Sequence, residues 1–173
     1  MDRGHNKFRC LRRFHNEQAK VMDRPRLCFP PYEFRLKEDA GKSLIFDDIR
    51  KKWIVCTPEE WVRQNLVRFL VQDCAYPQAL VALEKQVLVA ERSLRFDALI
   101  YDREFSPLML IECKAPTVKL TQKVFDQIWH YNYEIKAPFF IVTNGIDFIM
   151  GRYDAGKGVE FFETVKAFEE LVR

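Results

Sequence analysis

The hydrophobic pattern of this chain changes period several times, and each period predicts one kind of element. Apolar residues recur at helical spacing in two long segments, 58–74 and 121–135, so both are expected to form amphipathic helices. The first segment begins with a strong start signal, because Thr57 can cap the helix, Pro58 suits its first position and Glu60 completes a capping box.

Between and around these helices lie short runs rich in β-branched and aromatic residues, which are typical of strands. The expected strands are 43–46 and 53–56, forming a small hairpin, followed by 81–90, 94–101, 108–114, 138–143, 147–153 and 159–162. Thr121 is the expected cap of the second helix, Asn144-Gly145 favours a tight turn between strands, and 165–172 is a short final helix. This order of elements predicts an α/β fold class, with a mixed central sheet flanked by helices on its faces.

Length and composition place the chain among globular proteins of one domain. It has 173 residues, of which 48% are hydrophobic and 31% charged, enough for a substantial core. No apolar run approaches about 18 residues and the N-terminus lacks the apolar centre of a signal peptide, so we expect neither a membrane span nor export. Five scattered cysteines, never in a Cys-x-x-Cys pair, favour reduced thiols and a cytoplasmic location over disulfides or a zinc site.

The net charge of +3 is unevenly distributed along the chain. Residues 1–26 hold eight Lys and Arg against three Asp and Glu, whereas the remaining residues hold 20 against 22. The chain therefore divides into a basic, flexible extension over 1–26 and a single domain over 27–173. The extension could contact phosphate groups weakly, although a solvated tail is the simpler interpretation.

Acidic residues interrupt two of the expected strands, and a lysine ends one of them. Asp97 lies within the apolar run 94–101, and Glu112 and Lys114 lie in the run 108–114. Residues two apart in a strand face the same side of a sheet, so Glu112 and Lys114 share a face, and pairing of the two strands would place Asp97 beside Glu112. Buried carboxylates need a partner, and oxygen ligands of this kind suit Mg²⁺ or Mn²⁺. The pattern therefore predicts a metal site at which Lys114 orients the attacking water or stabilises negative charge on a phosphate.

A less specific interpretation of the same residues is also open. A single Glu-x-Lys on a strand is usually a solvated edge or a surface ion pair. Here the residues before Glu112 are apolar on both faces of the strand, and Asp97 occurs in a similarly apolar setting, which favours the functional interpretation.

The order of these motifs, Asp97 and then Glu112-x-Lys114, resembles the signature of the PD-(D/E)XK nuclease superfamily. Gln127-x-x-x-Tyr131 on the following helix is similar to the Gln-x-x-x-Tyr motif of its RecB-like branch. Further segments are similar to the N-terminal domain of type I restriction enzyme R subunits, in its short stand-alone bacterial form. They are 58–64 (Pro-Glu-Glu-Trp-Val-Arg-Gln), 76–77 (Tyr-Pro), 95–97 (Arg-Phe-Asp), 111–116 (Ile-Glu-Cys-Lys-Ala-Pro) and 142–145 (Val-Thr-Asn-Gly). The resemblance covers about residues 30–155.

This resemblance implies a restriction-endonuclease-like fold and a Mg²⁺-dependent phosphodiesterase acting on DNA, an endodeoxyribonuclease. By it, Asp97 and Glu112 hold the metal and Lys114 assists the attacking water. Gln127 joins the catalytic set and, with Tyr131 on the same helical face, contacts DNA or the surroundings of the metal. The alternative without function is that Tyr131 packs in the core and Gln127 lies on the helix surface.

In this superfamily an acidic residue of the first helix often completes the site, so the resemblance also implies a further metal ligand. Glu59 shares the apolar face of the first helix and is the candidate by geometry, whereas Glu60 is better explained by its capping role. Arg63 and Gln64 could bind phosphate, but exposed helix positions are the simpler expectation for both.

Three functions stay open at this point. The first is metal-dependent hydrolysis of DNA phosphodiester bonds, with DNA as partner and either other restriction-system subunits or a second copy of the chain. The second is a non-catalytic DNA-binding or assembly module that keeps the nuclease fold, and the third is a metal-dependent enzyme acting on RNA or a nucleotide. ATP-driven translocation is not expected, because Gly41-Lys42-Ser43 lacks the earlier glycine of a phosphate-binding loop, where Leu36 stands.

Overall fold

The computed structural model describes residues 24–84, 86–89, 92–154, 156 and 158–172, and for 86–89 and 92–95 it describes the backbone alone. All but the last three residues of the predicted extension over 1–26 lie outside this part of the chain. Of those three, Arg24 donates a hydrogen bond to Ser43 Oγ at 2.8 Å and lies over the indole ring of Trp61. Arg24 therefore already contacts the domain that follows it.

The strands of the described chain are β1 (Leu36–Asp39), β2 (Lys42–Asp47), β3 (Lys52–Val55), β4 (Val81–Leu83), β5 (Gln86–Val89), β6 (Arg92–Arg95), β7 (Ala98–Tyr101), β8 (Pro107–Cys113), β9 (Phe139–Thr143), β10 (Phe148–Asp154) and β11 (Gly158–Phe162). The helices are α1 (Pro58–Gln72), α2 (Gln122–Ile135) and α3 (Phe168–Leu171), with a 3-10 turn at Gln78–Leu80. Both predicted long helices are present, and the expected final helix shortens to the four residues of α3.

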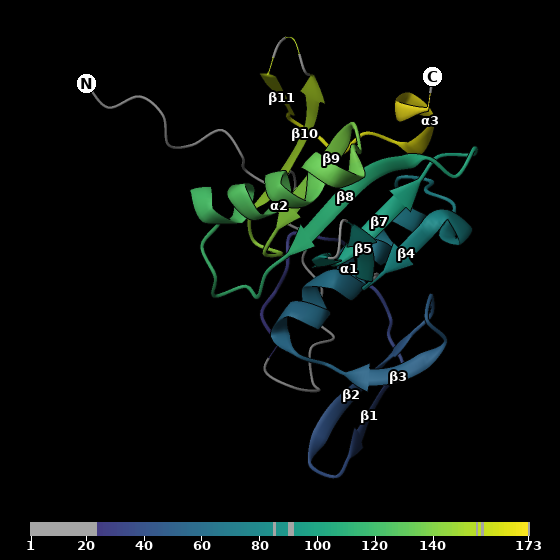
Figure 1. Ribbon diagram of the computed structural model, residues 1–173. Coiled ribbons are helices and arrows are strands. Elements are labelled where there is room, and N and C mark those ends of the chain that lie inside the picture. Colours follow the sequence, from purple (N-terminus) through teal and green to yellow (C-terminus); the bar gives the residue numbers. More distant parts are fainter. Residues whose placement is uncertain (1–23, 85, 90–91, 155, 157, 173) are drawn as a thin grey trace.

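The first three strands form a small antiparallel sheet of their own, in the order β1-β2-β3. The predicted hairpin over 43–46 and 53–56 is confirmed by β2 and β3, in which Phe46 stands opposite Trp53. β1 was not predicted, because Leu36–Asp39 is mostly charged and has no repeating apolar pattern. Figure 1 shows this sheet projecting from the bottom of the molecule, below α1.

A mixed six-stranded sheet forms the centre of the molecule, in the order β11-β10-β9-β8-β7-β4. β8 and β9 are parallel, and the other neighbouring pairs are antiparallel. α2 lies in the connection between the two parallel strands, which need a long crossover. The expected α/β class with a mixed central sheet flanked by helices is therefore confirmed.

Two predicted strands are each divided in the structure. The expected strand over 81–90 becomes β4 and β5, and the one over 94–101 becomes β6 and β7. β4 pairs with β7 in the central sheet, whereas β5 and β6 pair with each other in a separate ribbon. The first division has a physical reason, because Glu84 has a φ of 45°, a left-handed backbone that cannot continue a strand.

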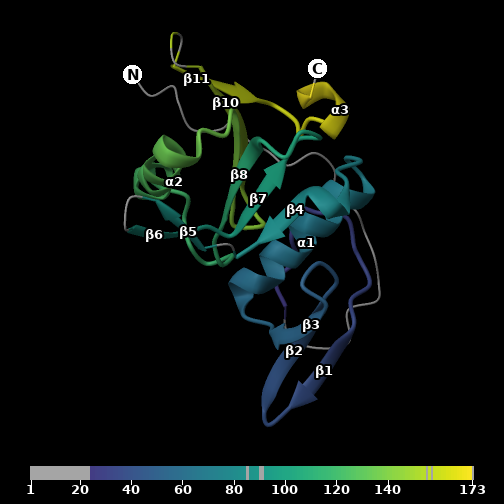
Figure 2. The same ribbon diagram turned by 45° about the vertical axis from the view of Figure 1, so that its right-hand side comes forward.

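α1 packs on one face of the central sheet (Figure 2). Val62 and Leu66 of this helix are buried together with Met109, Ile111 and Cys113, the residues of β8 that alternate onto this face. Cys113 therefore points into this packing, on the face of β8 opposite Glu112. This layer is the larger of the two apolar cores and also includes Phe168 of α3.

The start of α1 confirms one capping prediction and corrects another. Thr57 Oγ1 accepts a hydrogen bond from the backbone N of Glu60 at 3.1 Å, so the predicted cap is present. The predicted capping box is wrong, because the Glu60 carboxylate binds the guanidinium groups of Arg50 and Arg63 instead of the backbone N of Thr57.

α2 covers the opposite face of the sheet, in front of β8 in Figure 1. Val124 and Ile128 of the helix are buried against Leu110 of β8 and Phe140 of β9. Thr121 occupies the N-cap position as predicted, but its side chain makes no capping hydrogen bond. In the described part of the chain, no helix has both the length and the apolar character needed to cross a membrane.

Candidate active site

Asp97 lies at the end of the ladder between β7 and β8. The last pair of that ladder is Ala98 with Ile111, so Asp97 stands one position further along, opposite Glu112. The Asp97 side chain reaches across to β8, where its Oδ2 accepts a hydrogen bond from the backbone N of Cys113 at 2.6 Å. The structure thus brings Asp97 and Glu112 to adjacent positions on two paired segments.

Glu112, Lys114 and Gln127 form one hydrogen-bonded cluster. Lys114 Nζ donates to Glu112 Oε1 at 2.5 Å, and Gln127 Nε2 donates to the same oxygen at 2.6 Å. Lys114 Nζ also donates to Gln127 Oε1 at 3.2 Å. Because Glu112 is only 3% exposed, these donors take the place of water around its carboxylate. Glu112 and Lys114 meet as predicted, although Lys114 lies one residue past the end of β8.

α2 supplies Gln127 and Tyr131, which lie four residues apart on one helical face. Gln127 Nε2 donates a long hydrogen bond, of 3.4 Å, to the Tyr131 hydroxyl. The amide of Gln127 otherwise binds Glu112 and Lys114, so it holds this charged pair together. Tyr131 is half-buried and also packs against the apolar layer beneath α2, so part of the packing alternative applies to it.

The charges in this cluster change the proton affinity of its members. Burial raises the pKa of Glu112 to about 7, and the Asp97 carboxylate adds to the rise while Lys114 opposes it. For Lys114, burial is the largest single influence and would lower the pKa of the amine. The hydrogen bond to Glu112 and the surrounding carboxylate charges together outweigh burial, so the pKa is raised. Lys114 therefore stays protonated at neutral pH and acts as a hydrogen-bond donor rather than as a base.

The two glutamates at the start of α1 have different surroundings. The Glu59 side chain is 43% exposed, and burial, followed by the charge of Asp97, raises its pKa. The Lys114 ammonium acts on the same carboxylate in the opposite direction. Glu60 is buried and bound by two arginines. The Glu59 carboxylate therefore lies within electrostatic reach of Asp97 and Lys114.

A buried ion-pair network borders the site, and the sequence patterns did not reveal it. Two arginines hold it together. Arg63 binds Glu60, Glu84 and Asp97, and Arg50 binds Asp47, Glu60 and Glu84. The expectation that Arg63 and Gln64 are exposed is wrong, since their exposed fractions are 3% and 5%. Glu59 and Glu60 lie within one turn of these residues on α1, and this spacing is a local signal. Glu84, Asp97 and Asp47 come from distant segments of the chain.

The donor atoms of the site suit a hard divalent cation such as Mg²⁺. Asp97 and Glu112 offer carboxylate oxygens from adjacent positions, and their repulsion contributes to the raised pKa of Glu112, so a cation shared by them relieves an unfavourable interaction. Mg²⁺ often binds through one or two carboxylates and keeps several waters. Among the described residues, no three His, Cys, Asp or Glu side chains converge on a ready-made metal site. Glu59 as a further ligand therefore stays a prediction.

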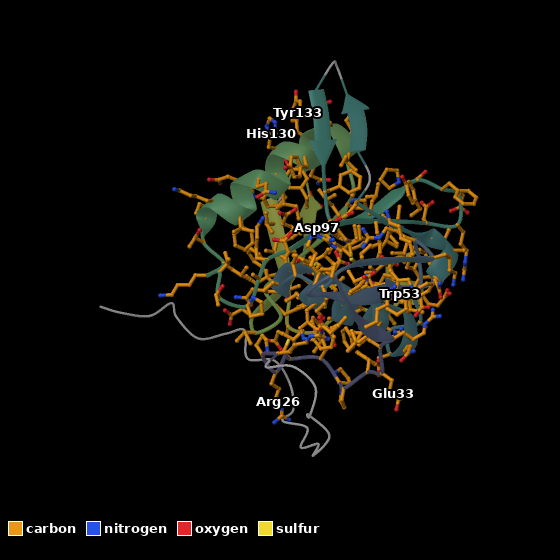
Figure 3. The ribbon with its side chains drawn as sticks, turned by 90° about the horizontal axis from the view of Figure 1, so that it is seen from below. Arg26, Glu33, Trp53, Asp97, His130 and Tyr133 are labelled. Carbon is orange, nitrogen blue, oxygen red and sulfur yellow. The ribbon has the colours of Figure 1, made fainter. Side chains whose placement is uncertain are left out.

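Other residues with reactive or aromatic side chains lie away from this cluster. Figure 3, seen from below, labels Asp97 near the middle of the molecule, with His130 and Tyr133 on the side of α2 and Trp53 on the side of β3. His130 is exposed and its ring neighbours only Tyr131 among the ring contacts of the described residues. Trp129 packs edge-on against Phe140 in the core, as expected for a structural aromatic.

Comparison with solved structures gives two distant likenesses. One is to a fragment described as an HsdR subunit of a type I restriction enzyme from Vibrio vulnificus YJ016, with 16% identity and a TM-score of 0.47, covering 63% of this chain and 24% of that one. The other is to a protein from Anabaena variabilis ATCC 29413 described as a nuclease belonging to DUF820, with 14% identity and a TM-score of 0.42, covering 74% and 80% of the two chains. This chain thus spans about a quarter of the HsdR fragment. At these scores neither likeness assigns a function.

A family model gives the decisive match. No curated protein matches the chain. The model of the type I restriction enzyme R protein N terminus matches residues 58–168, a segment that contains Asp97, Glu112, Lys114 and Gln127. This segment is well over half of the chain and covers α1, the central sheet and α2. The chain therefore belongs to the family of type I restriction enzyme R protein N termini.

Proposed function

We propose that this chain hydrolyses phosphodiester bonds of DNA with a divalent cation, Mg²⁺ or Mn²⁺, held by Asp97 and Glu112. The observation that carries the proposal is the cluster in which Lys114 and Gln127 converge on Glu112, opposite Asp97. Membership of the R protein N-terminal family supports a nuclease-like role. Because the chain belongs to this family, the partners to test are DNA and either other subunits of a restriction system or a second copy of the chain. We expect the protein to act in the cytoplasm.

Each side chain of the cluster has a separate task in this reaction. A divalent cation bound by the two carboxylates would supply Lewis-acid stabilisation of the phosphate and an acidified water. Lys114, which stays protonated, donates to the attacking water or to a phosphate oxygen and stabilises negative charge as it develops there. Gln127 keeps Lys114 and Glu112 in one geometry, and the Tyr131 hydroxyl lies at the edge of the cluster, where a DNA phosphate can bind it.

The direct test is cleavage of supercoiled plasmid and linear duplex DNA in Mg²⁺ or Mn²⁺. The wild type is expected to cut both substrates, and the reaction is expected to stop with a chelator. Asp97→Ala and Lys114→Ala are each expected to lose cleavage while keeping the fold. Arg103→Ala is the control, because Arg103 forms an exposed ion pair with Glu169 at the other end of the β7–β8 ladder.

One observation favours a second function, a DNA-binding or assembly module without turnover. Both carboxylates already pair with cations of the chain, Asp97 with Arg63 and Glu112 with Lys114. A wild-type protein that binds duplex DNA but never cuts it in either metal would establish this module and exclude the nuclease. Cleavage of RNA, but not of DNA, would establish the third function instead.

A further inference from the structure

The chain itself fixes both carboxylate oxygens of Asp97. Arg63 Nη2 donates to Oδ1 at 2.6 Å, and the backbone N of Cys113 donates to Oδ2 at 2.6 Å. The Arg63 side chain is 4% exposed and the Asp97 side chain 13%, so water contributes little to this arrangement. The direction of the lone pairs that stay free on Asp97 therefore depends on where Arg63 holds Oδ1.

Arg63 is in turn held by two carboxylates that it shares with a second arginine. Arg63 Nη1 donates to Glu60 and, at 2.9 Å, to Glu84 Oε1. Arg50 binds the other oxygen of each: its Nη2 donates to Glu60 Oε1 at 2.8 Å and its Nη1 to Glu84 Oε2. Asp47, which is fully buried, binds Arg50 Nε. A continuous relay of ion pairs thus joins the turn between β2 and β3 to the residue that fixes the site.

Backbone strain occurs at two points of this relay. Lys51, directly after Arg50, has a φ of 53°, and Glu84 has a φ of 45°. Non-glycine residues rarely adopt this left-handed conformation, and they keep it where surrounding contacts over-determine it, often at functional sites. The Asp47 carboxylate supplies such contacts to the turn, because Oδ1 accepts hydrogen bonds from the backbone N of Ile49 at 2.8 Å and of Arg50 at 2.9 Å.

We propose that Arg63 is a positioning residue, which orients Asp97 toward the metal and limits the negative charge around it, and that Arg50 holds Arg63 in place. The proposal rests on the proposed role of Asp97. Along the relay, five carboxylates, including Glu59 at 3.4 Å from Arg63, face two guanidinium groups, so an excess of negative charge stays beside Asp97 even with both arginines present. The relay also gives a role to the three-stranded sheet, which lies outside the residues that match the family.

Charge and geometry can be separated by two substitutions at one position. Arg63→Lys keeps the positive charge but loses the planar fork that reaches four carboxylates at once. Arg63→Gln also removes the charge, which leaves Asp97 and the three glutamates that pair with Arg63 with one cation fewer. Their negative charge then attracts a divalent ion more strongly. If Arg63 served only to hold the fold, both variants would be less stable. Arg63→Gln would then not bind a divalent ion more tightly than Arg63→Lys.

The experiment titrates each folded variant with Mn²⁺ alone by calorimetry and then measures DNA cleavage. For Arg63→Lys we expect a Mn²⁺ Kd within about threefold of wild type, a kcat lower by about tenfold or more, and little change in KM. For Arg63→Gln we expect tighter Mn²⁺ binding, by about fivefold or more, together with a lower kcat. Arg50→Lys is expected to lower kcat in the same direction and by less.

Arg68→Lys is the matched control, because Arg68 lies on the same helix and pairs with Asp48 of the same turn, at 2.7 Å, without contacting the relay. It should leave the Mn²⁺ Kd and kcat unchanged.

The proposal would be overturned if both Arg63 variants bound Mn²⁺ more weakly and this loss ran in parallel with a lower melting temperature. A wild type that binds Mn²⁺ and cuts nothing would refute the proposed function alone, since the sign of the Arg63→Gln effect on Mn²⁺ binding still decides the role of Arg63. If Arg63→Gln fails to fold, the Arg63→Lys and Arg50→Lys kinetics decide.

Discussion

At the scale of single residues, the buried position of Glu112 lowers the free energy of unfolding when its carboxylate is charged. Burial and the nearby Asp97 carboxylate raise its pKa from 4.5 to about 7. A carboxyl group whose pKa is higher in the folded chain than in the unfolded chain favours folding while it is protonated. That contribution is fully present below pH 4.5 and is lost as the pH rises through about 7.

Glu112→Gln should therefore stabilise the metal-free protein at the upper end of this range. The amide can still accept from Lys114 but has no charge to bury, so we expect a gain of roughly 1–3 kcal/mol over wild type at about pH 8 and little gain at about pH 4.5. Urea denaturation with a chelator, at several pH values, measures it. Glu160→Gln is the control, since its side chain is 60% exposed; a Glu112→Gln curve that runs parallel to wild type across this range would refute the expectation.

Gln127 is expected to act on turnover rather than on DNA affinity, because its amide binds Glu112 and Lys114. Gln127→Leu keeps most of the volume but removes these hydrogen bonds, and we expect kcat to fall by about 10–100-fold with KM nearly unchanged. Steady-state cleavage kinetics measure both constants. Gln122→Leu is the matched control on the same helix, since Gln122 is exposed and binds only Asp126 among the described hydrogen bonds. A raised KM with normal kcat would instead indicate direct contact of Gln127 with DNA.

Some residues of this site could be predicted from the sequence and others could not, for a physical reason. Asp97, Glu112 and Lys114 are visible because each places a charge in an otherwise apolar run, where it needs a partner. Arg50 and Glu84 stand in polar surroundings, where a charged residue needs no explanation. Their importance arises only when residues 34 positions apart come together, and no local pattern contains that information.

At the scale of elements, the two long helices begin in different ways. Thr57 caps α1 through its side chain, whereas Thr121 stands at the N-cap of α2 without such a bond. Thr57→Ala is expected to lower the free energy of unfolding by about 1 kcal/mol, and Thr121→Ala by clearly less. Chemical denaturation of both variants measures the difference. Equal losses would show that the Thr57 hydrogen bond contributes nothing beyond the extended backbone that both residues adopt.

Elements were predictable where a hydrophobic period continues over many residues. α1 and α2 have such periods and appear close to their expected bounds. The strands near the site were expected to be longer, because 81–90 and 94–101 are mostly apolar and the polar residues within them do not by themselves indicate a break. The interruption at Glu84 comes from its left-handed backbone, which its bonds to two arginines favour. Tertiary contacts therefore override the local preference there.

At the scale of the whole molecule, the proposed DNA binding should depend strongly on salt. Lys119 and Lys123 are exposed, Lys119 in the loop that follows Lys114 and Lys123 in the first turn of α2, the helix that supplies Gln127. Affinity for duplex DNA, measured by fluorescence anisotropy, should fall linearly on a log–log scale as the salt concentration rises. Replacing both lysines by Gln should reduce the slope by about one to two. Arg103→Gln serves as the control, and an unchanged slope in the double variant would place the DNA elsewhere on the surface.

The two hydrogen bonds that hold Asp97 have a consequence for the entropy of ligand binding. A side chain that rotates freely must be immobilised when it binds, at about 0.5–1.5 kcal/mol for each such group. Asp97 has already lost this freedom during folding, because Arg63 and the backbone of Cys113 engage both of its oxygens. A ligand therefore meets a preorganised rotamer, and structures of this protein with and without a bound cation should superimpose at that side chain.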